Sequence, residues 1–297
     1  MNTIQRILRP AAAAALAAAL SACGSTGMSP GGGQPSGGLY GVVTKFRGTP
    51  VAGATVRLEE TAQQASTDSS GRFRIQTDYR GPGTVSVSAP GYAPLRIQVA
   101  VGDGVEKRLR LVRPADYDPR LAWELAALTS DPYGVGDPDV TRWPGPVIVY
   151  TVDRSPPWNS NLDRYLVEAA EHWTMATAGA YRVVEGTSQF YIAVKATHAP
   201  CGRTDIMGCG DSYSGNGIWR AFVEVKPTAG VDVVAHELGH AMGFPFHTDR
   251  LGYLMYRGGG VYPATDDEAA VFCVLYAAPV GARFSQLAVP DPPRCAP

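Results

Sequence analysis

The sequence of 297 residues has no excess of either charge, because 26 lysines and arginines stand against 27 aspartates and glutamates, a formal net charge of −1. Without a basic excess to attract phosphates, we expect no nucleic-acid partner. The chain also has no run of about 18 or more apolar residues, which excludes a helical channel or transporter. Charged residues make up only 18% and hydrophobic residues 45%, so the chain can bury a core and global disorder is excluded.

Histidine and cysteine are scarce, with five residues of each, so any pattern that uses several of them is informative. Glycine and proline are abundant, with 34 and 24 residues, and this composition favours strands, turns and loops over a long helical bundle. The length predicts about two domains.

The N-terminus has the pattern of an export signal. Two arginines precede an apolar run over residues 11–19 that is too short to span a bilayer, and small residues then lead to Cys23. This order indicates a signal peptide over residues 1–22, and its end resembles the lipobox of bacterial lipoproteins. The resemblance implies that Cys23 is lipidated and anchors the protein in the bacterial cell envelope, facing the periplasm or the exterior. Gly24 after it favours the outer over the inner membrane. The alternative is an ordinary signal peptide with an incidental cysteine.

Two further segments precede the region that contains the candidate catalytic and metal-binding residues. Residues 23–38 are rich in Gly, Ser and Pro and predict a flexible tether. Residues 39–113 contain short alternating runs between turn residues, which predicts a small all-β sandwich. The runs lie at residues 54–58, 72–75, 84–88 and 108–111.

This stretch resembles the carboxypeptidase regulatory-like domain, whose fold is of the transthyretin or Ig-like type. The residues that carry the resemblance are 41–43, 50–56, 67–68, 71–73 and 91–92. They are turn and core residues and specify a fold rather than a reaction, so we expect a spacer or docking module.

The remainder of the chain predicts an α+β domain. Residues 114–145 are expected to connect the two regions, with one short helix at 121–128. Residues 146–297 begin with a continuous apolar strand, which is followed by a helix with a cap formed by Ser160 and Asp163. Strands are expected at 147–152, 181–184, 190–195 and 221–226, and further helices at 231–243 and 265–276. Thr265 and Glu268 are expected to form a capping box at the start of the last helix.

Five residues of the segment 236–247 form a pattern typical of a catalytic zinc site. His236 and His240 are four apart and share one face of a helix, so both rings can ligate one ion. Gly243 can adopt a positive φ, end the helix and turn the chain, so that His247 supplies a third nitrogen. Three protein ligands leave the fourth position to water. Glu237 lies beside the metal, where it can take a proton from the zinc-bound water and return it to the leaving amine.

This pattern, HExxHxxGxxH followed by Met255, resembles the metzincin clan of zinc endopeptidases. The resemblance implies a metzincin-like zinc peptidase domain with one catalytic Zn²⁺, in which the methionine of a turn packs beneath the histidines. The similarity is matrixin-like, since the helix that begins near Thr265 resembles a matrixin helix in which an acidic residue braces the methionine turn. Either Asp267 or Glu268 can have this role, and both are also typical of a helix N-terminus. No pattern indicates a calcium site.

Three features depart from the main families of the clan. Thr248 after the third histidine is not typical of them. Arg257 stands where astacin-like enzymes place a transition-state tyrosine, so we assign no tyrosine, Tyr256 included, to the oxyanion. No latency cysteine precedes the catalytic region, and Cys295 is expected to be half of a disulfide, with a free inhibitory thiol as the alternative.

Four cysteines remain after Cys23, and an even number in an exported protein predicts two disulfides. Three connectivities are possible. We favour Cys201–Cys209 and Cys273–Cys295, because cysteines that are near in sequence pair easily. A zinc-binding cysteine cluster is disfavoured, since the paired CxxC spacing is missing.

Three positions complete the expectations for the site. His172 is expected at the surface or at the edge of the core, and His198 in a loop, with no metal assigned to either. Residues 212–219 are the expected edge strand, to which a substrate of metzincins adds through backbone hydrogen bonds.

The leading hypothesis is a zinc-dependent metalloendopeptidase, a hydrolase of protein or peptide substrates that is tethered to the bacterial cell envelope. One alternative is a non-catalytic surface-binding lipoprotein with a vestigial zinc site, against which the intact Glu237 argues. The other is a zinc amidase acting on cell-wall peptides, since the same activated water attacks any suitable amide. The sequence does not indicate an oligomeric state.

Overall fold

The computed structural model describes residues 37–126, 139–215 and 217–296. The predicted signal peptide, the lipidation site at Cys23 and most of the tether therefore lie outside the described residues. Within the described part of the chain, no helix combines the length and the apolar character that crossing a bilayer requires.

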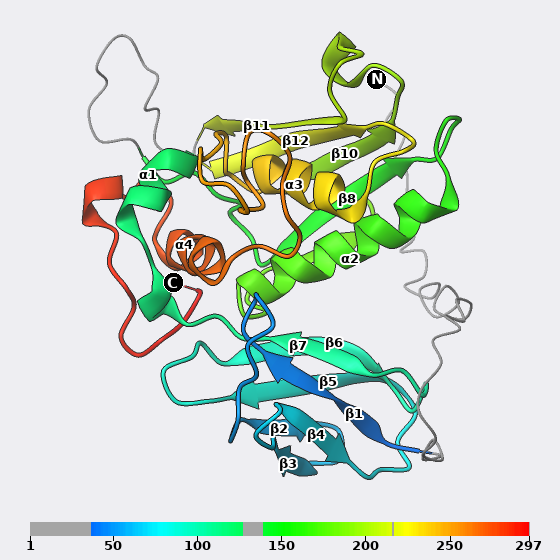
Figure 1. The fold of residues 1–297 in the computed structure, drawn as a ribbon, viewed down its shortest axis with the longest axis vertical. Helices are drawn as coiled ribbons and strands as arrows, with labels where there is room; N and C mark the ends of the chain where they lie inside the picture. The colour runs from blue at the N-terminus through cyan, green and yellow to red at the C-terminus, as the bar shows by residue number, and fades with distance from the viewer. Residues whose placement is uncertain (1–36, 127–138, 216, 297) are drawn as a thin grey trace, which may run out of the picture. The chain divides into compact units, whose positions relative to one another are not determined.

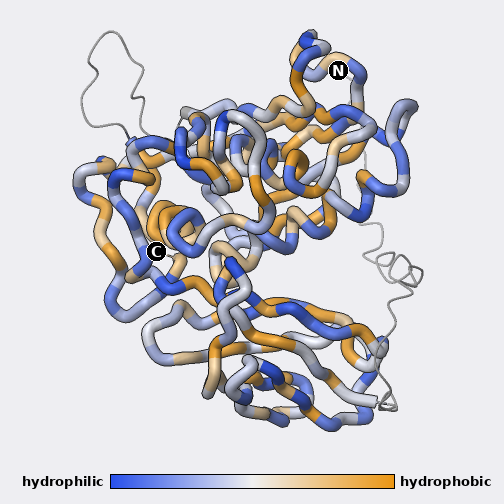
Figure 2. The backbone as a smooth tube through the Cα atoms, in the orientation of Figure 1, coloured by the Kyte–Doolittle hydropathy of each residue, from blue (hydrophilic) through white to orange (hydrophobic). Residues whose placement is uncertain are grey.

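The first region is a β-sandwich of two small sheets (Figure 1). One sheet has the strand order β4-β1-β7 and the other β3-β2-β5-β6. The strands are β1 (Leu39–Thr44), β2 (Thr55–Leu58), β3 (Gln64–Ser66), β4 (Arg72–Ile75), β5 (Gly81–Ser88), β6 (Leu95–Val101) and β7 (Lys107–Arg110). Alternate positions face the core, as Val85 and Val87 of β5 do. Figure 2 shows the resulting mixture of hydrophobic and hydrophilic residues along these strands. The predicted β-sandwich is confirmed.

The second region is α+β, as predicted. Its sheet has the order β11-β12-β10-β8-β9, in which β11 is antiparallel to β12 and the other pairs are parallel. The strands are β8 (Val147–Asp153), β9 (Arg182–Glu185), β10 (Tyr191–Ala196), β11 (Gly208–Gly215) and β12 (Gly217–Val225). The helices are α1 (Pro119–Ala126), α2 (Ser160–Ala176), α3 (Val231–Ala241) and α4 (Asp266–Ala277), with short 3₁₀ turns η1 (Pro114–Asp116), η2 (Pro200–Gly202) and η3 (Phe284–Gln286). Helices α2 and α3 lie side by side over one face of the sheet (Figure 1).

One of the two predicted helix caps is present in the structure, and the other is formed by a different residue. At α4 the predicted capping box is present, since Thr265 accepts from the backbone of Glu268 and the Glu268 side chain accepts from the backbone of Thr265. At α2 the prediction of Ser160 and Asp163 is wrong. The cap is Asn159, whose side chain accepts from the backbone N–H of residues 161 and 162.

Both favoured disulfides are confirmed, Cys201–Cys209 and Cys273–Cys295. The first joins η2 to the start of β11, and the second ties α4 to the C-terminal segment. Because Cys295 is half of a disulfide, the alternative of a free inhibitory thiol is wrong.

The edge strand of the sheet begins and ends earlier in the chain than predicted. The edge strand is β11, Gly208–Gly215, so it begins four residues before the predicted start. Trp219, at the end of the predicted segment, belongs to β12, which is inside the sheet. Strands β11 and β12 pair antiparallel as far as Gly215 and Gly217, a reversal of the chain that the alternation of side chains did not reveal.

The segment between the two regions packs into the second one. Leu121 and Leu125 of α1 are buried, and the indole N–H of Trp143 donates to the carbonyl of Ala241 at 3.0 Å. Helix α1 begins at Pro119, two residues before the predicted start, and residues 127 and 128 lie outside the described part. Residues of the connecting segment on both sides of positions 127–138 therefore contribute to the core of the second region.

A loop of the sandwich contacts the second region, and both belong to one compact unit, Ser36–Pro297. Lys45 forms ion pairs with Asp116 at 2.9 Å and with Asp266 at 3.3 Å. Phe46 is buried, and its ring centroid lies 5.1 Å from that of His172. The expectation that His172 lies at the surface or the edge of the core is wrong, because the sandwich loop covers it.

His172 is fully buried, and neither of its ring nitrogens has a hydrogen-bond partner among the described residues. Burial lowers the pKa of His172 well below its ordinary value, and the nearby charge of Arg110 lowers it further. The folded protein therefore keeps the ring neutral, while the unfolded chain takes up a proton near pH 6.5. Stability is fully present above that pH and decreases as the pH falls below it.

We expect the metal-free protein to lose about 1.4 kcal/mol of unfolding free energy through His172 between pH 7.5 and pH 5.5. His172→Phe keeps an aromatic ring against Phe46 and removes the titrating group, so its loss over this range is smaller by that amount. Urea unfolding of both proteins at the two pH values measures the difference. Equal losses in the two proteins would show that His172 does not cause this pH dependence.

Candidate metal centre

Three histidines converge at the C-terminal half of α3. His236 and His240 lie on the helix, and His247 is brought to them by the turn that follows it. Nε2 of His247 is 3.0 Å from Nε2 of His236 and 3.2 Å from Nε2 of His240. Nitrogens that bind one tetrahedral zinc at about 2.0–2.1 Å are about 3.3 Å apart. The triad therefore matches the ligand spacing of a single ion and is the one such cluster among the described residues.

Backbone carbonyls orient two of the three rings. Nδ1 of His236 lies 2.6 Å from the carbonyl oxygen of Leu254, and Nδ1 of His240 lies 2.6 Å from that of Phe244. A carbonyl only accepts, so Nδ1 carries the proton in both rings and Nε2 presents its lone pair. This arrangement of supporting hydrogen bonds is typical of histidines that bind a metal.

Burial keeps these rings neutral. It lowers the pKa of His236 to about 4 and that of His240 to about 3, while the hydrogen bonds to Leu254 and Phe244 oppose the shift. Burial also lowers the pKa of His247, and the positive charge of Arg257 adds to the effect. At neutral pH all three rings offer a free nitrogen, so the donor set fits a borderline metal such as zinc.

Glu237 is buried between α3 and the edge strand β11, with 6% of its surface exposed. A Cβ on Gly208 would lie 2.6 Å from Cγ and Oε1 of the Glu237 side chain. A Cβ on Gly210 would lie 2.4 Å from the backbone carbonyl oxygen of Glu237. Only glycine leaves room for the glutamate at these two positions of the strand. Burial raises the pKa of Glu237 to about 8, and a hydrogen bond from the backbone of Gly210 opposes the shift. A carboxyl group with a pKa near neutrality suits a general base.

Met255 packs against the helix that carries the histidines. It is fully buried, and a Cβ on Gly239 would lie 2.6 Å from its sulfur atom. Gly239, between the two helical histidines, thus allows close approach of the methionine from below. Gly243 has a φ of +110°, as the pattern predicts, and the chain turns there towards His247.

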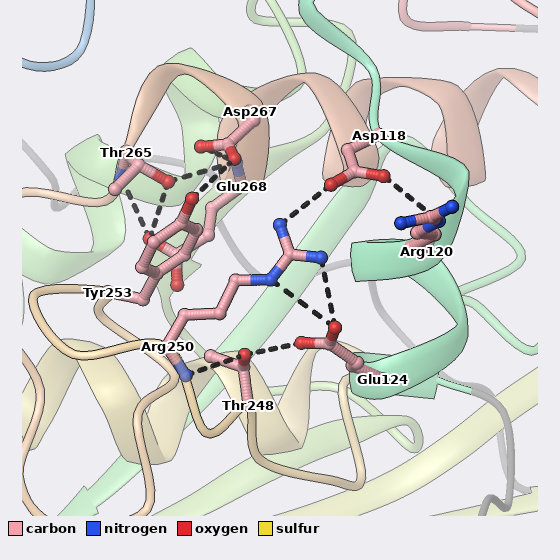
Figure 3. A network of polar contacts seen from close by, with 9 residues as sticks. All are labelled: Asp118, Arg120, Glu124, Thr248, Arg250, Tyr253, Thr265, Asp267 and Glu268. Atoms are coloured by element: carbon pink, nitrogen blue, oxygen red, sulfur yellow. Dashed lines mark hydrogen bonds and ion pairs between the residues drawn. The ribbon is translucent and has the colours of Figure 1, made fainter.

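The two acidic residues at the start of α4, Asp267 and Glu268, both contact the methionine turn. The sequence had left open which of them braces it. Glu268 accepts from the backbone N–H of Leu254 at 3.0 Å and of Met255 at 2.8 Å. Asp267 accepts from the hydroxyl of Tyr253 at 2.7 Å. Figure 3 shows these carboxylates facing the turn. Glu268 is the buried brace, and its bond to Leu254 also supports the carbonyl that orients His236.

The remaining candidates lie apart from the triad. His198 is exposed and belongs to no metal-binding cluster of the described residues. Arg257 and Asp249 form an exposed ion pair near His247. A cavity of about 580 Å³ lies on the sheet, lined by residues of β8, β10, β11 and β12, and none of the triad or Glu237 lines it.

Comparison with known proteins identifies the first region. Residues 38–112 match the carboxypeptidase regulatory-like domain. The N-terminal sandwich is therefore a domain of this family. The match ends at residue 112 and leaves the region of the metal centre unassigned.

Two solved structures of a type II cohesin–X-dockerin complex from Acetivibrio cellulolyticus are also similar to the chain. The C-terminal interface mutant is 26% identical over 25% of this chain and 51% of that chain, with a TM-score of 0.21. The N-terminal interface mutant is 28% identical over the same shares, with a TM-score of 0.20. This chain thus covers about half the length of those chains. No curated protein matches it.

Sequence reasoning missed several residues that shape the site. Gly208 and Gly210 alternate within a strand, and that spacing is a signal of close backbone approach that was available in the sequence. The pair of Glu124 and Arg250, which joins helix α1 to the segment after His247, gave no such signal, because the two residues lie more than a hundred positions apart in the sequence.

Proposed function

We propose that this protein is a zinc-dependent metalloendopeptidase of the bacterial cell envelope. The observation that carries the proposal is the convergence of three histidines, in which Nε2 of His236 and of His240 lie 3.0 and 3.2 Å from Nε2 of His247. The carboxyl group of Glu237 is buried beside them, on the helix that carries His236 and His240. A purely structural metal site has no use for a buried, unligating carboxyl group at this position.

The roles follow from the positions. Zinc, when bound, supplies a Lewis acid that polarises the scissile carbonyl and makes water acidic near neutral pH. His236, His240 and His247 are the residues that would bind it. Glu237 takes the proton of the attacking water and transfers it to the leaving amine. The edge strand β11 offers backbone groups to an extended peptide, which would add to the sheet as a further strand.

The resemblance to matrixin-like metzincins supports the same function. Met255 packs under α3 at Gly239, and the positive φ of Gly243 turns the chain as the HExxHxxGxxH pattern requires. Glu268 braces the methionine turn from the following helix. These contacts favour an intact catalytic centre over a vestigial one.

The location of the enzyme is proposed from the N-terminal sequence. Small residues before Cys23 and the tether after it favour a lipid anchor in the outer membrane. The regulatory-like domain then stands between the tether and the metal centre. Its role is that of a spacer that also contacts the second region through Lys45 and Phe46.

The test compares wild type and Glu237→Gln in the soluble chain from Ser25 onward, which contains the whole compact unit Ser36–Pro297. Both proteins are expected to bind one equivalent of zinc. We expect the substitution to lower the rate of cleavage of a mixed peptide library by about 100- to 10,000-fold, because the general base is lost while the ligands remain. Mass spectrometry of the products gives the rate and the cut sites.

The outcomes separate the hypotheses. Cleavage by wild type alone supports the endopeptidase and defines its specificity. If both proteins bind zinc and neither cleaves proteins or peptides, the endopeptidase hypothesis is wrong. Release of peptides from purified cell wall by wild type alone would then favour the amidase, and no reaction on either material would favour the non-catalytic binding protein.

A further inference from the structure

The third histidine of the triad is supported differently from the other two. His236 and His240 are buried, and a backbone carbonyl orients each ring through Nδ1. His247 is exposed, and its Nδ1 has no hydrogen bond to any described residue. The position of this ring must therefore come from the backbone that carries it.

Both neighbours of His247 bond to helix α1, which lies about 120 residues earlier in the chain. The backbone N–H of Phe246 donates to the carbonyl of Leu125 at 3.1 Å. The hydroxyl of Thr248 donates to Oε2 of Glu124 at 2.5 Å. The third ligand thus lies between two attachments to the end of one helix.

Thr248 has all of its polar groups bonded. It is fully buried, its backbone N–H donates to the carbonyl of Met255 at 3.0 Å, and its carbonyl accepts from the N–H of Arg257 at 3.2 Å. Its hydroxyl also accepts from the N–H of Arg250 at 3.1 Å. The hydroxyl therefore uses both its donor and its acceptor capacity, which leaves the residue next to His247 with a single arrangement.

Arg250 in turn fixes the carboxylate of Glu124 (Figure 3). Its guanidinium bonds Oε1 of Glu124 at 2.9 Å and Oδ2 of Asp118 at 2.7 Å, and it lies over the ring of Tyr253 at 5.8 Å. Since Arg250 also donates its backbone N–H to Thr248, the three residues Glu124, Arg250 and Thr248 form a closed ring of hydrogen bonds. All their charged groups are paired, and the paired side chains are 29–35% exposed to solvent.

We propose that Glu124 and Thr248 are positioning residues that hold His247 in its ligating position, so that α1 completes the metal centre. The inference rests on the proposed zinc site and deepens it. Without the ring of hydrogen bonds, an exposed histidine on a loop would have to be ordered when the metal binds, and the metal affinity would fall. The segment between the two regions is then a functional part of the site and more than a connection.

The experiment measures zinc affinity by competition with a chromophoric chelator in the soluble chain from Ser25 onward. We expect Thr248→Val, which keeps the shape but loses the hydroxyl, and Glu124→Ala each to weaken zinc binding by about 10- to 100-fold. Thr248→Ser keeps the hydroxyl and restores the affinity. Arg120→Ala changes an exposed side chain of the same helix and leaves the affinity at the wild-type value. The double variant is expected to be no weaker than Glu124→Ala alone, because that substitution already removes the bond to Thr248.

Two further readouts separate positioning from folding. The absorption spectrum of the Co²⁺-loaded protein reports the coordination geometry, and we expect it to change in Thr248→Val and not in Thr248→Ser. Thermal unfolding of the metal-free protein reports a structural contribution. If Thr248→Val and Glu124→Ala lower that Tm but leave zinc affinity and the Co²⁺ spectrum unchanged, the positioning role is wrong. A wild type that binds zinc without cleaving peptides would contradict the proposed function alone, and a wild type that binds no zinc would overturn both.

Discussion

His240→Ala is expected to remove zinc binding at physiological concentrations and with it all peptidase activity. His240 is the most buried ligand of the triad, and among the described residues the cluster holds no fourth ligand that could replace its Nε2. Complete zinc sites are worth about 10–16 kcal/mol, so the loss of one ligand costs about 3 kcal/mol and raises the Kd more than about a hundredfold. Chelator competition measures the affinity, and the peptide assay measures the activity.

The matched control is His198→Ala, which removes an exposed histidine outside the cluster. It should bind one zinc with the affinity of wild type. If His240→Ala binds zinc as tightly as His198→Ala, the triad is not the metal site. Circular dichroism of the metal-free proteins shows that both variants are folded.

Glu268→Ala should have the largest effect on stability, about 3–5 kcal/mol of unfolding free energy. The carboxylate is fully buried and accepts from the backbone N–H of Leu254, Met255 and Thr265, the last at 2.8 Å. Alanine leaves these donors without partners and removes the capping box of α4. Urea unfolding of the metal-free protein measures the loss. Zinc affinity should fall as well, because Leu254 carries the carbonyl that orients His236.

Asp267→Ala is the matched control for this variant. Asp267 precedes Glu268 on the same turn of helix, is partly exposed and accepts from the hydroxyl of Tyr253. Its loss should cost about 0.5–1.5 kcal/mol. If both variants lose a similar unfolding free energy, the buried hydrogen bonds of Glu268 contribute no additional stability. The methionine turn would then be held in place by other contacts.

The features that were predicted correctly depend on local patterns in the sequence. The period of the helix places His236 and His240 on one face, and a glycine at 243 permits the turn to His247. The capping box of Thr265 and Glu268 and both disulfides also depend on residues that are close in the chain. In each case a few neighbouring residues and fixed covalent geometry suffice.

Predictions failed where the alternatives were locally equivalent. Asn159 and Ser160 are both good caps, and packing at the start of α2 selected the first. The sequence allows strand β11 to begin at several positions, and in the structure it begins at Gly208, where glycine leaves room for Glu237. His172 has the pattern of an ordinary helix residue, and it is buried by residues distant in the chain, with the rings of Phe46 and Tyr262 each 5.1 Å away.

The sequence by itself therefore determined the α+β class, the regulatory-like sandwich and the identity of the three candidate ligands with their glutamate, and it favoured the disulfide pairs that the structure contains. Each depends on spacing, on periodicity or on turn chemistry within a short stretch of chain. The tertiary structure alone decided which acid braces the methionine turn, where the edge strand begins, and that α1 reaches the third histidine through Glu124 and Thr248. These contacts join segments up to about 120 residues apart, and they depend on how whole elements pack, which no local pattern encodes.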